Sequence, residues 1–347
     1  MQKSNMTAGL YIHIPFCKSK CPYCDFYSIK YQPDVATRYV DRLISTMDDY
    51  SGTFDTIYFG GGTPGILPAE ELGKIIAAAK DRFDIADRCE ITVECNPSKD
   101  MARDFVQYKS YGINRISIGM QSAVDRERFA LGRAAGRDKV QKTIVDARNA
   151  GIDNISLDIM LGTPKQSLES LDDTLRFVDS MAVQHISAYM LKIEEGTRFY
   201  QMRDSLALPC EDDLSAMYLK VVDSLNKMGL RQYEISNFAL PGYESRHNKK
   251  YWQLAPYLGL GKSAHSFWNG RRFYYDKEFN LVDDGVGGSD EERIMLGLRL
   301  TEGIDKSLLN RDVTPYIDMG LMVYKGDRVA LTPQGMLVSN TIISQLI

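Results

Sequence analysis

The sequence is poor in the features that mark membrane or nucleic-acid-binding proteins. No run approaches the roughly 18 apolar residues that a membrane-spanning helix needs, and the first residues lack the long apolar segment of a signal peptide. Basic residues form no long run and the formal net charge is −4, which excludes a strongly basic nucleic-acid footprint. We therefore expect a cytoplasmic protein without a transmembrane segment or a nucleic-acid partner.

Cysteine is also scarce, but it is not scattered. The chain has six cysteines in 347 residues, and Cys17, Cys21 and Cys24 fall within eight positions. In a reducing compartment this clustering predicts metal or redox chemistry rather than disulfides. The other three are expected to be buried structural thiols: Cys89, Cys95 and Cys210.

The chain does contain a regular alternation of short β-rich runs and longer amphipathic stretches. Repeated six times, it predicts parallel strands with right-handed crossovers. The expected strands are Leu10–Ile14, Thr56–Phe59, Glu90–Glu94, Arg115–Gly119, Ser156–Met160 and His185–Met190. The expected helices are Asp34–Asp48, Ala69–Asp81, Lys99–Tyr108, Lys139–Asn149 and Leu168–Asp179, with Gly112 and Gly151 expected at helix C-termini.

Residues capable of chemistry follow the ends of these strands: the cysteine loop, the Gly60-Gly61-Gly62 run, Glu94, Gln121 and Asp158. Sites built from many strand ends are typical of TIM-type barrels. Six units rather than eight predict an α/β protein with a partial (β/α)6 barrel. We expect the barrel over residues 1–210, an extension over 211–290 and a small α+β annex over 291–347.

The spacing of the clustered cysteines, Cys-x-x-x-Cys-x-x-Cys, suits three thiolates on three irons of a 4Fe–4S cubane, with the fourth iron left open. Zinc is the alternative, with His13 or a distant cysteine as the fourth ligand, and inert thiols are the least favoured. Gly60-Gly61-Gly62-Thr63-Pro64 follows the second strand. Such glycines allow a close backbone approach to a ligand and offer free N–H groups. An ordinary βα turn would look similar, whereas a phosphate loop is disfavoured because no Gly-Lys-Ser/Thr follows.

The two motifs, in this order, resemble those of the radical S-adenosylmethionine (SAM) superfamily. Residues 10–345 are similar to its coproporphyrinogen III oxidase-like branch, which contains the oxygen-independent coproporphyrinogen dehydrogenase and the HemW-type haem chaperones. The resemblance implies a 4Fe–4S cluster on Cys17, Cys21 and Cys24, with SAM completing the open iron. It also implies a SAM site, in which Asp158 binds ribose hydroxyls. The residues that match this site are Tyr11, Tyr23, Gly61, Gly62, Thr63, Glu94, Gln121, Arg133 and Asp158.

Within this branch the sequence resembles the HemW type. Phe26 stands where the dehydrogenase has a further cysteine, and only about ten residues precede the first strand, where the enzyme has a long closing segment. The segment His247-Asn248-Lys-Lys-Tyr251-Trp252 is similar to the HNxxYW signature that is associated with haem binding. On a helix His247 and Tyr251 share a face. From the residues alone a core histidine with aromatic packing is the favoured interpretation of the segment, and the resemblance favours haem binding instead.

The function that we expect is haem carriage, in which haem is bound and passed to an acceptor haemoprotein such as a respiratory enzyme. The implied cofactors are a 4Fe–4S cluster, SAM and haem, with a flavodoxin or ferredoxin as reductant. The alternatives are anaerobic oxidative decarboxylation of coproporphyrinogen III and a radical SAM methyl or alkyl transfer. The family often has His where Ala135 stands, and His265 matches the family pattern without an assigned role.

Overall fold

The computed structural model describes residues 7–97 and 99–347, and its centre is six parallel strands that are neighbours in the order in which they occur in the sequence. All six predicted strands are confirmed; five have bounds within three residues of the prediction, and the strand expected at Glu90–Glu94 begins six residues earlier. They are β1 (Ala8–Ile14), β4 (Thr53–Gly61), β5 (Asp84–Cys95), β6 (Arg115–Gln121), β7 (Asn154–Leu161) and β8 (His185–Met190). The predicted α/β class is therefore correct.

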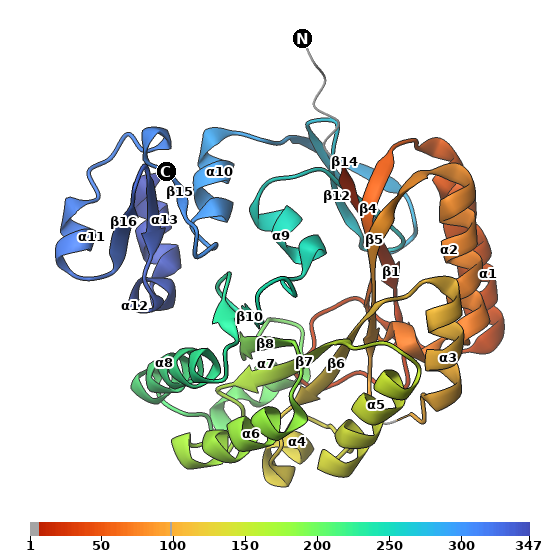
Figure 1. Cartoon of the computed structure of the whole chain (residues 1–347), viewed down its shortest axis with the longest axis horizontal. Coiled ribbons are helices and arrows are strands. Elements are labelled where there is room, and N and C mark those ends of the chain that lie inside the picture. The colour runs from red at the N-terminus through yellow and green to blue at the C-terminus, as the bar shows by residue number, and fades with distance from the viewer. Residues whose placement is uncertain (1–6, 98) are drawn as a thin grey trace.

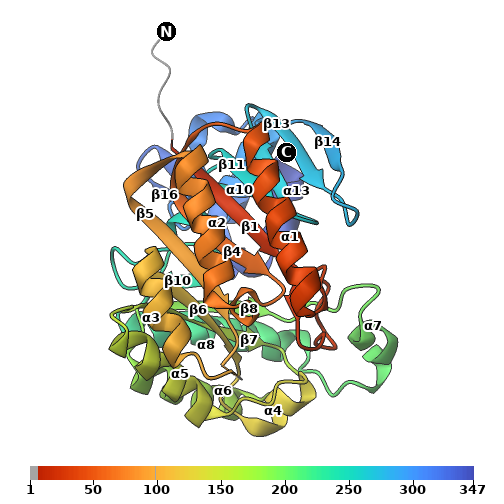
Figure 2. The same ribbon diagram turned by 90° about the vertical axis from the view of Figure 1, so that its right-hand side faces the viewer.

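Helices that follow the strands cover the outer face of this sheet, as Figures 1 and 2 show for α1, α2 and α3. Gly112 and Gly151 have φ angles of +97° and +80° just past two of the helices, which confirms the two predicted C-terminal glycines. The helices of this layer are α1 (Pro33–Thr46), α2 (Ala69–Arg82), α3 (Ala102–Tyr111), α4 (Asp125–Ala130), α5 (Arg137–Asn149) and α6 (Leu168–Met181), with 3-10 turns at Met47–Asp49 and Pro64–Ile66.

The strands alternate between two kinds of side chain, and this alternation creates the interior of the molecule. Residues such as Ile57, Val93 and Ile116 are almost fully buried in the apolar core that the strands share with the helices. Their neighbours on the opposite face are polar, for example Glu94 on β5 and Ser117 on β6, which are paired in register. Because strand side chains alternate between faces, the outer face of the sheet packs against the helices in the apolar core, and the inner face lines a polar chamber.

The sheet does not close on itself among the described residues, so the barrel is partial. Short strands extend both edges to give 12 strands in all. The β1 edge continues with the parallel β11 (Tyr257–Leu260) and then the antiparallel β12 (His265–Trp268), β13 (Arg271–Tyr275) and β14 (Leu281–Val286), and the β8 edge continues with β10 (Asn237–Ala239) and β9 (Arg231–Gln232). The sequence pattern did not reveal β11 to β14, and the boundaries at 210 and 290 stay a prediction.

Four further segments connect or flank these strands. A short parallel pair joins the two ends of the cysteine loop, and α9 lies on the inner side of the sheet in Figure 1. The segments are β2 (Phe16–Cys17) with β3 (Ile29–Lys30), α7 (Arg198–Met202) with the 3-10 turn Arg203–Ser205, α8 (Glu211–Lys227) and α9 (Arg246–Trp252).

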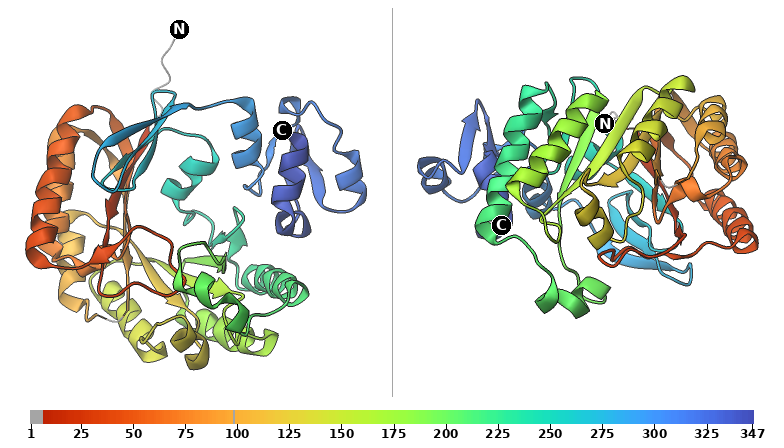
Figure 3. Two further views of the ribbon diagram at one scale, coloured as in Figure 1. Left: turned by 180° about the vertical axis from the view of Figure 1, so that it is seen from behind. Right: turned by 90° about the horizontal axis from the view of Figure 1, so that it is seen from below.

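The C-terminal residues form a small α+β unit beside α8, on the side away from α1 (Figures 1 and 3). Its three-stranded sheet has the order β15-β17-β16, and Gly326, with φ of +63°, lies in the tight turn of the β16–β17 hairpin. The unit contains α10 (Asp290–Gly297), β15 (Ile304–Asp305), the 3-10 turn Lys306–Leu308, α11 (Thr314–Asp318), β16 (Met322–Lys325), β17 (Arg328–Leu331), α12 (Pro333–Leu337) and α13 (Ser339–Leu346). Across the parts of the chain that the structure describes, no helix has the length and apolarity to cross a membrane.

Candidate functional site

The cysteine loop lies between β2 and β3, at the end of the first barrel strand. Cys17, Cys21 and Cys24 are all partly exposed and line one pocket together with Thr63 from the glycine run. The Thr63 hydroxyl lies 3.7 Å from the Cys17 sulfur. The loop therefore presents its three thiols toward the strand that carries the glycines.

The thiols interact with one another. Burial raises the pKa of Cys24, and the neighbouring Cys21 and Cys17 raise it further. Three thiolates this close repel each other unless a cation lies between them. Within residues 7–97 and 99–347, no three His, Cys, Asp or Glu side chains surround a point that would suit a single metal ion. A cubane needs a different arrangement, because each thiolate binds a different iron, and the shared pocket fits that requirement.

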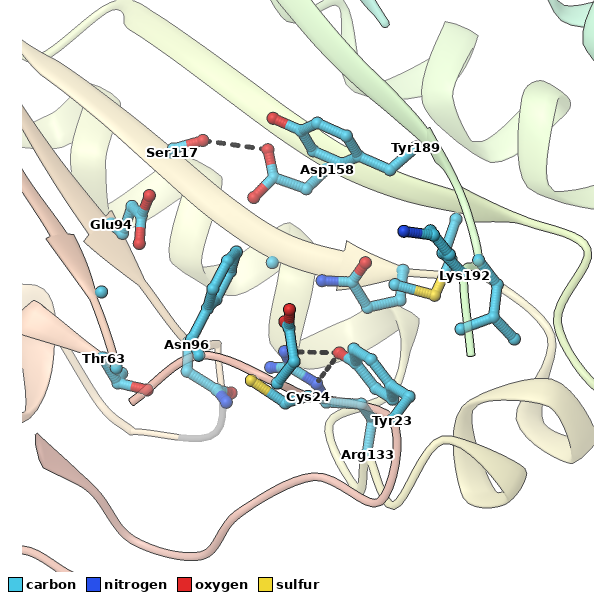
Figure 4. A pocket seen from close by; sticks show the side chains of 18 of the residues that line it. Tyr23, Cys24, Thr63, Glu94, Asn96, Ser117, Arg133, Asp158, Tyr189 and Lys192 are labelled. Atoms are coloured by element: carbon cyan, nitrogen blue, oxygen red, sulfur yellow. Dashed lines mark hydrogen bonds between the residues drawn. The ribbon is translucent and has the colours of Figure 1, made fainter. Parts of the chain in front are cut away.

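A cavity of about 400 Å³ lies next to Cys24, at the carboxyl ends of the barrel strands. Figure 4 shows Glu94, Asp158 and Arg133 arranged around it, with Tyr23 and Cys24 on the side of the cysteine loop. The cavity brings together eight of the nine residues predicted for the SAM site, namely Tyr23, Gly61, Gly62, Thr63, Glu94, Gln121, Arg133 and Asp158.

Two half-buried carboxyl groups face this cavity. Glu94 accepts a hydrogen bond from the Tyr58 hydroxyl at 2.8 Å. Asp158 accepts one from the Ser117 hydroxyl at 3.0 Å, which Figure 4 shows. Burial raises the pKa of Glu94 to about 7 and the pKa of Asp158 to about 6, and the charge of Asp158 adds to the shift at Glu94. These carboxylates are poised to accept hydrogen bonds from ligand ammonium or hydroxyl groups, which would stabilise their charged forms.

Gln121 and Arg133 complete the wall beside β6. Gln121 has a φ of +71°, an uncommon backbone conformation for a residue with a side chain, at an irregularity in the pairing of β6 with β7. Arg133 donates to the Tyr23 hydroxyl from Nη2 at 2.9 Å and from Nε at 3.3 Å. Strained backbone at the end of a barrel strand is typical of ligand sites, and Arg133 ties the cysteine loop to that site.

The glycine run differs from expectation in one respect. Its N–H groups are not free, because those of Gly62 and Thr63 donate to the carbonyls of Ile14 and Phe16 at 2.9 Å, and that of Gly61 donates to Glu94. The expectation of free donors is therefore wrong, since parallel pairing with β1 continues through the run. Gly61 has a φ of +111°, and a Cβ there would lie 2.5 Å from the His13 ring. Glycine is thus required for packing at this position, and the run can contact a ligand through its carbonyl oxygens and the Thr63 side chain, which lines the first cavity.

A second cavity of about 550 Å³ adjoins the first, and both are lined by Asp25, Phe26, Gly61 and Glu94. The other residues of the second cavity are mainly aromatic or basic: Tyr11, His13, Tyr27, Tyr251, Tyr257, Ser263, His265 and Lys277. Tyr11 therefore lies in this cavity and not with the other predicted SAM-site residues, so its role toward SAM stays a prediction.

The HNxxYW segment forms α9, and His247 on it is completely buried. Its Nδ1 is 2.8 Å from the Thr56 hydroxyl and its Nε2 is 2.8 Å from the Tyr251 hydroxyl, which confirms that His247 and Tyr251 share a face. Burial lowers the pKa of His247 to about 3. In this arrangement both ring nitrogens are occupied and the ring reaches neither cavity.

The other residues of the segment differ in exposure to the second cavity. Tyr251 lines that cavity. Trp252 is half-buried, with the Arg299 guanidinium 5.6 Å from its ring centre, and the backbone N–H of Asn248 bonds to the Ser245 hydroxyl at 3.3 Å. Asn248 and Trp252 line neither cavity, so their predicted part in haem binding is not tested by the structure.

The three remaining cysteines divide into two classes. Cys89 and Cys95 are buried, as expected. Cys210 is exposed, so the expectation of burial is wrong there. It precedes the first turn of α8, where its backbone enters the helix from a solvent-facing loop.

Several polar residues of the first cavity were missed by the sequence reasoning. Tyr58, Ser117 and Tyr189 all line it, beside the carboxylates that were predicted. The signal was present in the strands: Ser117 and Gly119 alternate with Ile116 and Ile118, and the same apolar–polar alternation marks the other barrel strands. In a strand with helices on its outer face, alternate polar residues indicate an inner ligand chamber.

We expect Glu94→Gln to change the pH dependence of stability. Because the folded protein raises the pKa of Glu94 from 4.5 to about 7, it binds this proton more tightly than the unfolded chain does, and stability falls as pH rises between these values. Glutamine removes that loss. The melting temperature of the ligand-free variant, minus that of the wild type, should therefore be more positive at pH 8 than at pH 5. The exposed Asp204→Asn serves as control.

The chain is similar in sequence to known protein families and to individual proteins. Residues 11–178 match the Radical SAM superfamily and residues 291–338 match the HemN C-terminal domain. A protein of Bacillus subtilis named "Heme chaperone HemW" is 34% identical, with 96% of this chain and 97% of that protein covered. The same name belongs to a protein of Lactococcus lactis, 30% identical over 100% of this chain and 98% of its own length, and to one of Escherichia coli, 37% identical over 74% and 69%.

A solved structure shows the same fold. Coproporphyrinogen III oxidase (HemN) from Escherichia coli, described as a radical SAM enzyme, superimposes with a TM-score of 0.84. The match covers 98% of this chain and 90% of that chain at 21% sequence identity. At this identity the likeness establishes the radical SAM fold and not a shared reaction.

Proposed function

Since the chain belongs to the HemW family within the radical SAM superfamily, we propose that it is a haem chaperone that carries a 4Fe–4S cluster and SAM and passes haem to an acceptor haemoprotein. The observation that carries this proposal is the similarity to a HemW haem chaperone over 96% of the chain. The acceptor that we propose is a haem-requiring respiratory enzyme in the cytoplasm or facing it.

The cluster is proposed to bind Cys17, Cys21 and Cys24, which line one pocket beside the glycine run. Bound SAM would supply the chemistry of the superfamily, in which an electron from the cluster cleaves the sulfonium. The chain's own residues bind and orient that ligand: Glu94 and Asp158 accept hydrogen bonds, and Arg133 holds the loop through Tyr23. We propose that Asp158 accepts from ribose hydroxyls and that carbonyl oxygens of the glycine run accept from the amino group.

A reductant would dock beside the cysteine loop. Lys18, Lys20 and Lys30 are exposed there and line a pocket with Cys17, on a chain whose net charge is negative. Such a local basic surface suits an acidic electron-transfer protein. We therefore propose a flavodoxin or ferredoxin as the electron donor.

Asp158→Asn should weaken SAM binding while cluster absorbance is kept. The side chain is half-buried, lines the first cavity and lies outside the cysteine loop, so the variant loses hydrogen bonds to a charged acceptor and keeps the thiols. One such bond is worth roughly 1.5–3 kcal/mol, or about 10- to 150-fold in affinity. Calorimetry on the reconstituted protein measures this, with the exposed Asp204→Asn as matched control. Equal affinity in both variants would remove Asp158 from the SAM site.

The second candidate function is coproporphyrinogen III dehydrogenation. It is considered because the chain shares its fold with the oxidase. Phe26 argues against it by resemblance, since the dehydrogenase has a cysteine at that position. Phe26 is 61% exposed and borders both cavities, so it changes the surface that a substrate would meet.

One experiment separates the two functions. Anaerobically reconstituted protein is given haem in one sample, and SAM, a reductant and coproporphyrinogen III in another. We expect a Soret shift on haem binding, transfer of the bound haem to an apo-haemoprotein, and no protoporphyrinogen. Steady decarboxylation would replace the chaperone proposal with the enzyme. If the protein shows no haem binding and no decarboxylation, both functions are refuted, and methyl or alkyl transfer is the next function to test.

A further inference from the structure

The chain has four histidines. In three of them both ring nitrogens lie within hydrogen-bond distance of other groups in the core. His185 is 2.7 Å from the Ser156 hydroxyl and 2.9 Å from the Tyr233 hydroxyl, and His247 is bound at both ring nitrogens as described above. His13 is 3.0 Å from the Tyr11 hydroxyl and 3.3 Å from the Tyr27 carbonyl. All three are buried.

His265 differs from these in every respect. It is exposed, it lines the second cavity, and neither ring nitrogen has a hydrogen-bond partner among residues 7–97 and 99–347. Its ring stacks on Tyr274 of the neighbouring strand, with centroids 4.9 Å apart and planes 25° from parallel. Burial of part of the ring lowers the pKa of His265 below its usual value. The imidazole is therefore neutral near pH 7. One face of its ring packs on Tyr274, and its ring nitrogens are available to a ligand.

The cavity around His265 has the chemistry of a site for a planar aromatic ligand that carries a metal ion, and the carboxyl groups of Asp25 and Glu94 line only the side that it shares with the first cavity. Tyr27, Tyr257 and the exposed Phe26 supply aromatic surface, and Lys277 supplies an exposed ammonium group that no described acidic residue pairs with. Its volume of about 550 Å³ lies in the range of roughly 300–1,000 Å³ that small-molecule and cofactor sites have. An aromatic wall, an open imidazole and a cation match the macrocycle, the iron and the propionates of haem.

From this geometry we infer that His265 is an axial ligand of haem bound in the second cavity, with Lys277 on a propionate and Phe26 between the haem and the SAM cavity. The inference rests on the proposed haem-carrier function and assigns a site to it. It moves the ligand from the HNxxYW helix to the β12–β13 hairpin, and it leaves Tyr251 as a wall residue rather than part of a ligand pair. Haem there would share Phe26, Asp25, Gly61 and Glu94 with the SAM cavity.

The test is haem titration of the full, cluster-reconstituted chain, followed by Soret absorbance and by electron paramagnetic resonance of the ferric complex. For His265→Ala we expect a changed ferric spectrum and roughly tenfold or greater loss of affinity, because even groups that only support a metal ligand cost about 10- to 100-fold when removed. Exogenous imidazole should restore the wild-type spectrum in this variant, which a purely structural role would not permit. Cluster absorbance reports that the variant is folded.

Two further variants make the outcome decisive. Arg271→Ala, on the same hairpin but at an exposed pair with Asp283, should bind haem as the wild type does. His247→Gln tests the α9 segment. A wild-type spectrum in His265→Ala would overturn the inference. Loss of the wild-type spectrum in His247→Gln, with that spectrum kept in His265→Ala, would assign the ligand to α9 instead. In both cases haem binding by the wild type would leave the proposed function standing, whereas a wild type that binds no haem would refute that function itself.

Discussion

Cys21→Ala is expected to abolish the 4Fe–4S cluster, with iron and acid-labile sulfide falling to background after anaerobic reconstitution. The loop provides three thiols that line one pocket, and each is needed because each binds a separate iron of the cubane. Cys17→Ala and Cys24→Ala should behave in the same way. Visible absorbance and metal analysis on the same samples measure the effect.

The matched control is Cys210→Ser, since that thiol is exposed and lies outside the loop. It should retain full cluster content, as should the buried Cys89→Ala if the fold is kept. A complete cluster in Cys21→Ala would refute the ligand assignment. Zinc instead of iron and sulfide in the wild type would point to the alternative metal site.

His247→Leu is expected to destabilise the whole protein strongly. The substitution leaves the buried Thr56 hydroxyl and the half-buried Tyr251 hydroxyl without the partners that they have at 2.8 Å. An unsatisfied buried polar group costs about 1–3 kcal/mol, so the free energy of unfolding should fall by about that amount for Thr56, with a smaller further loss at Tyr251, whose side chain lines the second cavity. Denaturant unfolding measures this loss.

Tyr251→Phe is the comparison, because it removes only the half-buried hydrogen bond and should cost less than His247→Leu. Unchanged stability of His247→Leu would show that the buried network contributes nothing. The prediction bears on haem as well, since weaker haem binding by a His247 variant has two explanations. Unfolding data on the same sample separate loss of the fold from loss of a ligand.

The barrel could be predicted from the sequence because each parallel strand is a short apolar run followed by an amphipathic helix. The carboxylates Glu94 and Asp158 were predictable for a related reason, since they stand at strand ends that parallel pairing brings to one edge. Thus eight of the nine expected SAM-site residues line one cavity, although nothing about the sequence fixes how they contact a ligand.

The other features of the fold and the site depend on contacts between residues far apart in the chain, which the sequence pattern does not reveal. Strands β11 to β14 are short and rich in aromatic residues and glycine, so they show no clear period, and their place is fixed by pairing with β1 from far away in the chain. The use of the glycine N–H groups by Ile14 and Phe16 is another long-range effect. So is the burial of His247 against Thr56, which separates the HNxxYW segment from both cavities.

The pairing of β11 with β1, in the register Tyr257 to Gly9, has a consequence for synthesis on the ribosome. As the chain emerges, β4 reaches β1 early and covers one of its edges, but the other edge waits for residues 257–260. At about 5–20 residues per second, roughly 200 further residues take about 10–40 s. During that time the nascent chain carries an open, apolar strand edge of the kind that invites wrong pairing. We therefore expect β1 to be the strand most exposed to wrong pairing until β11 is synthesised.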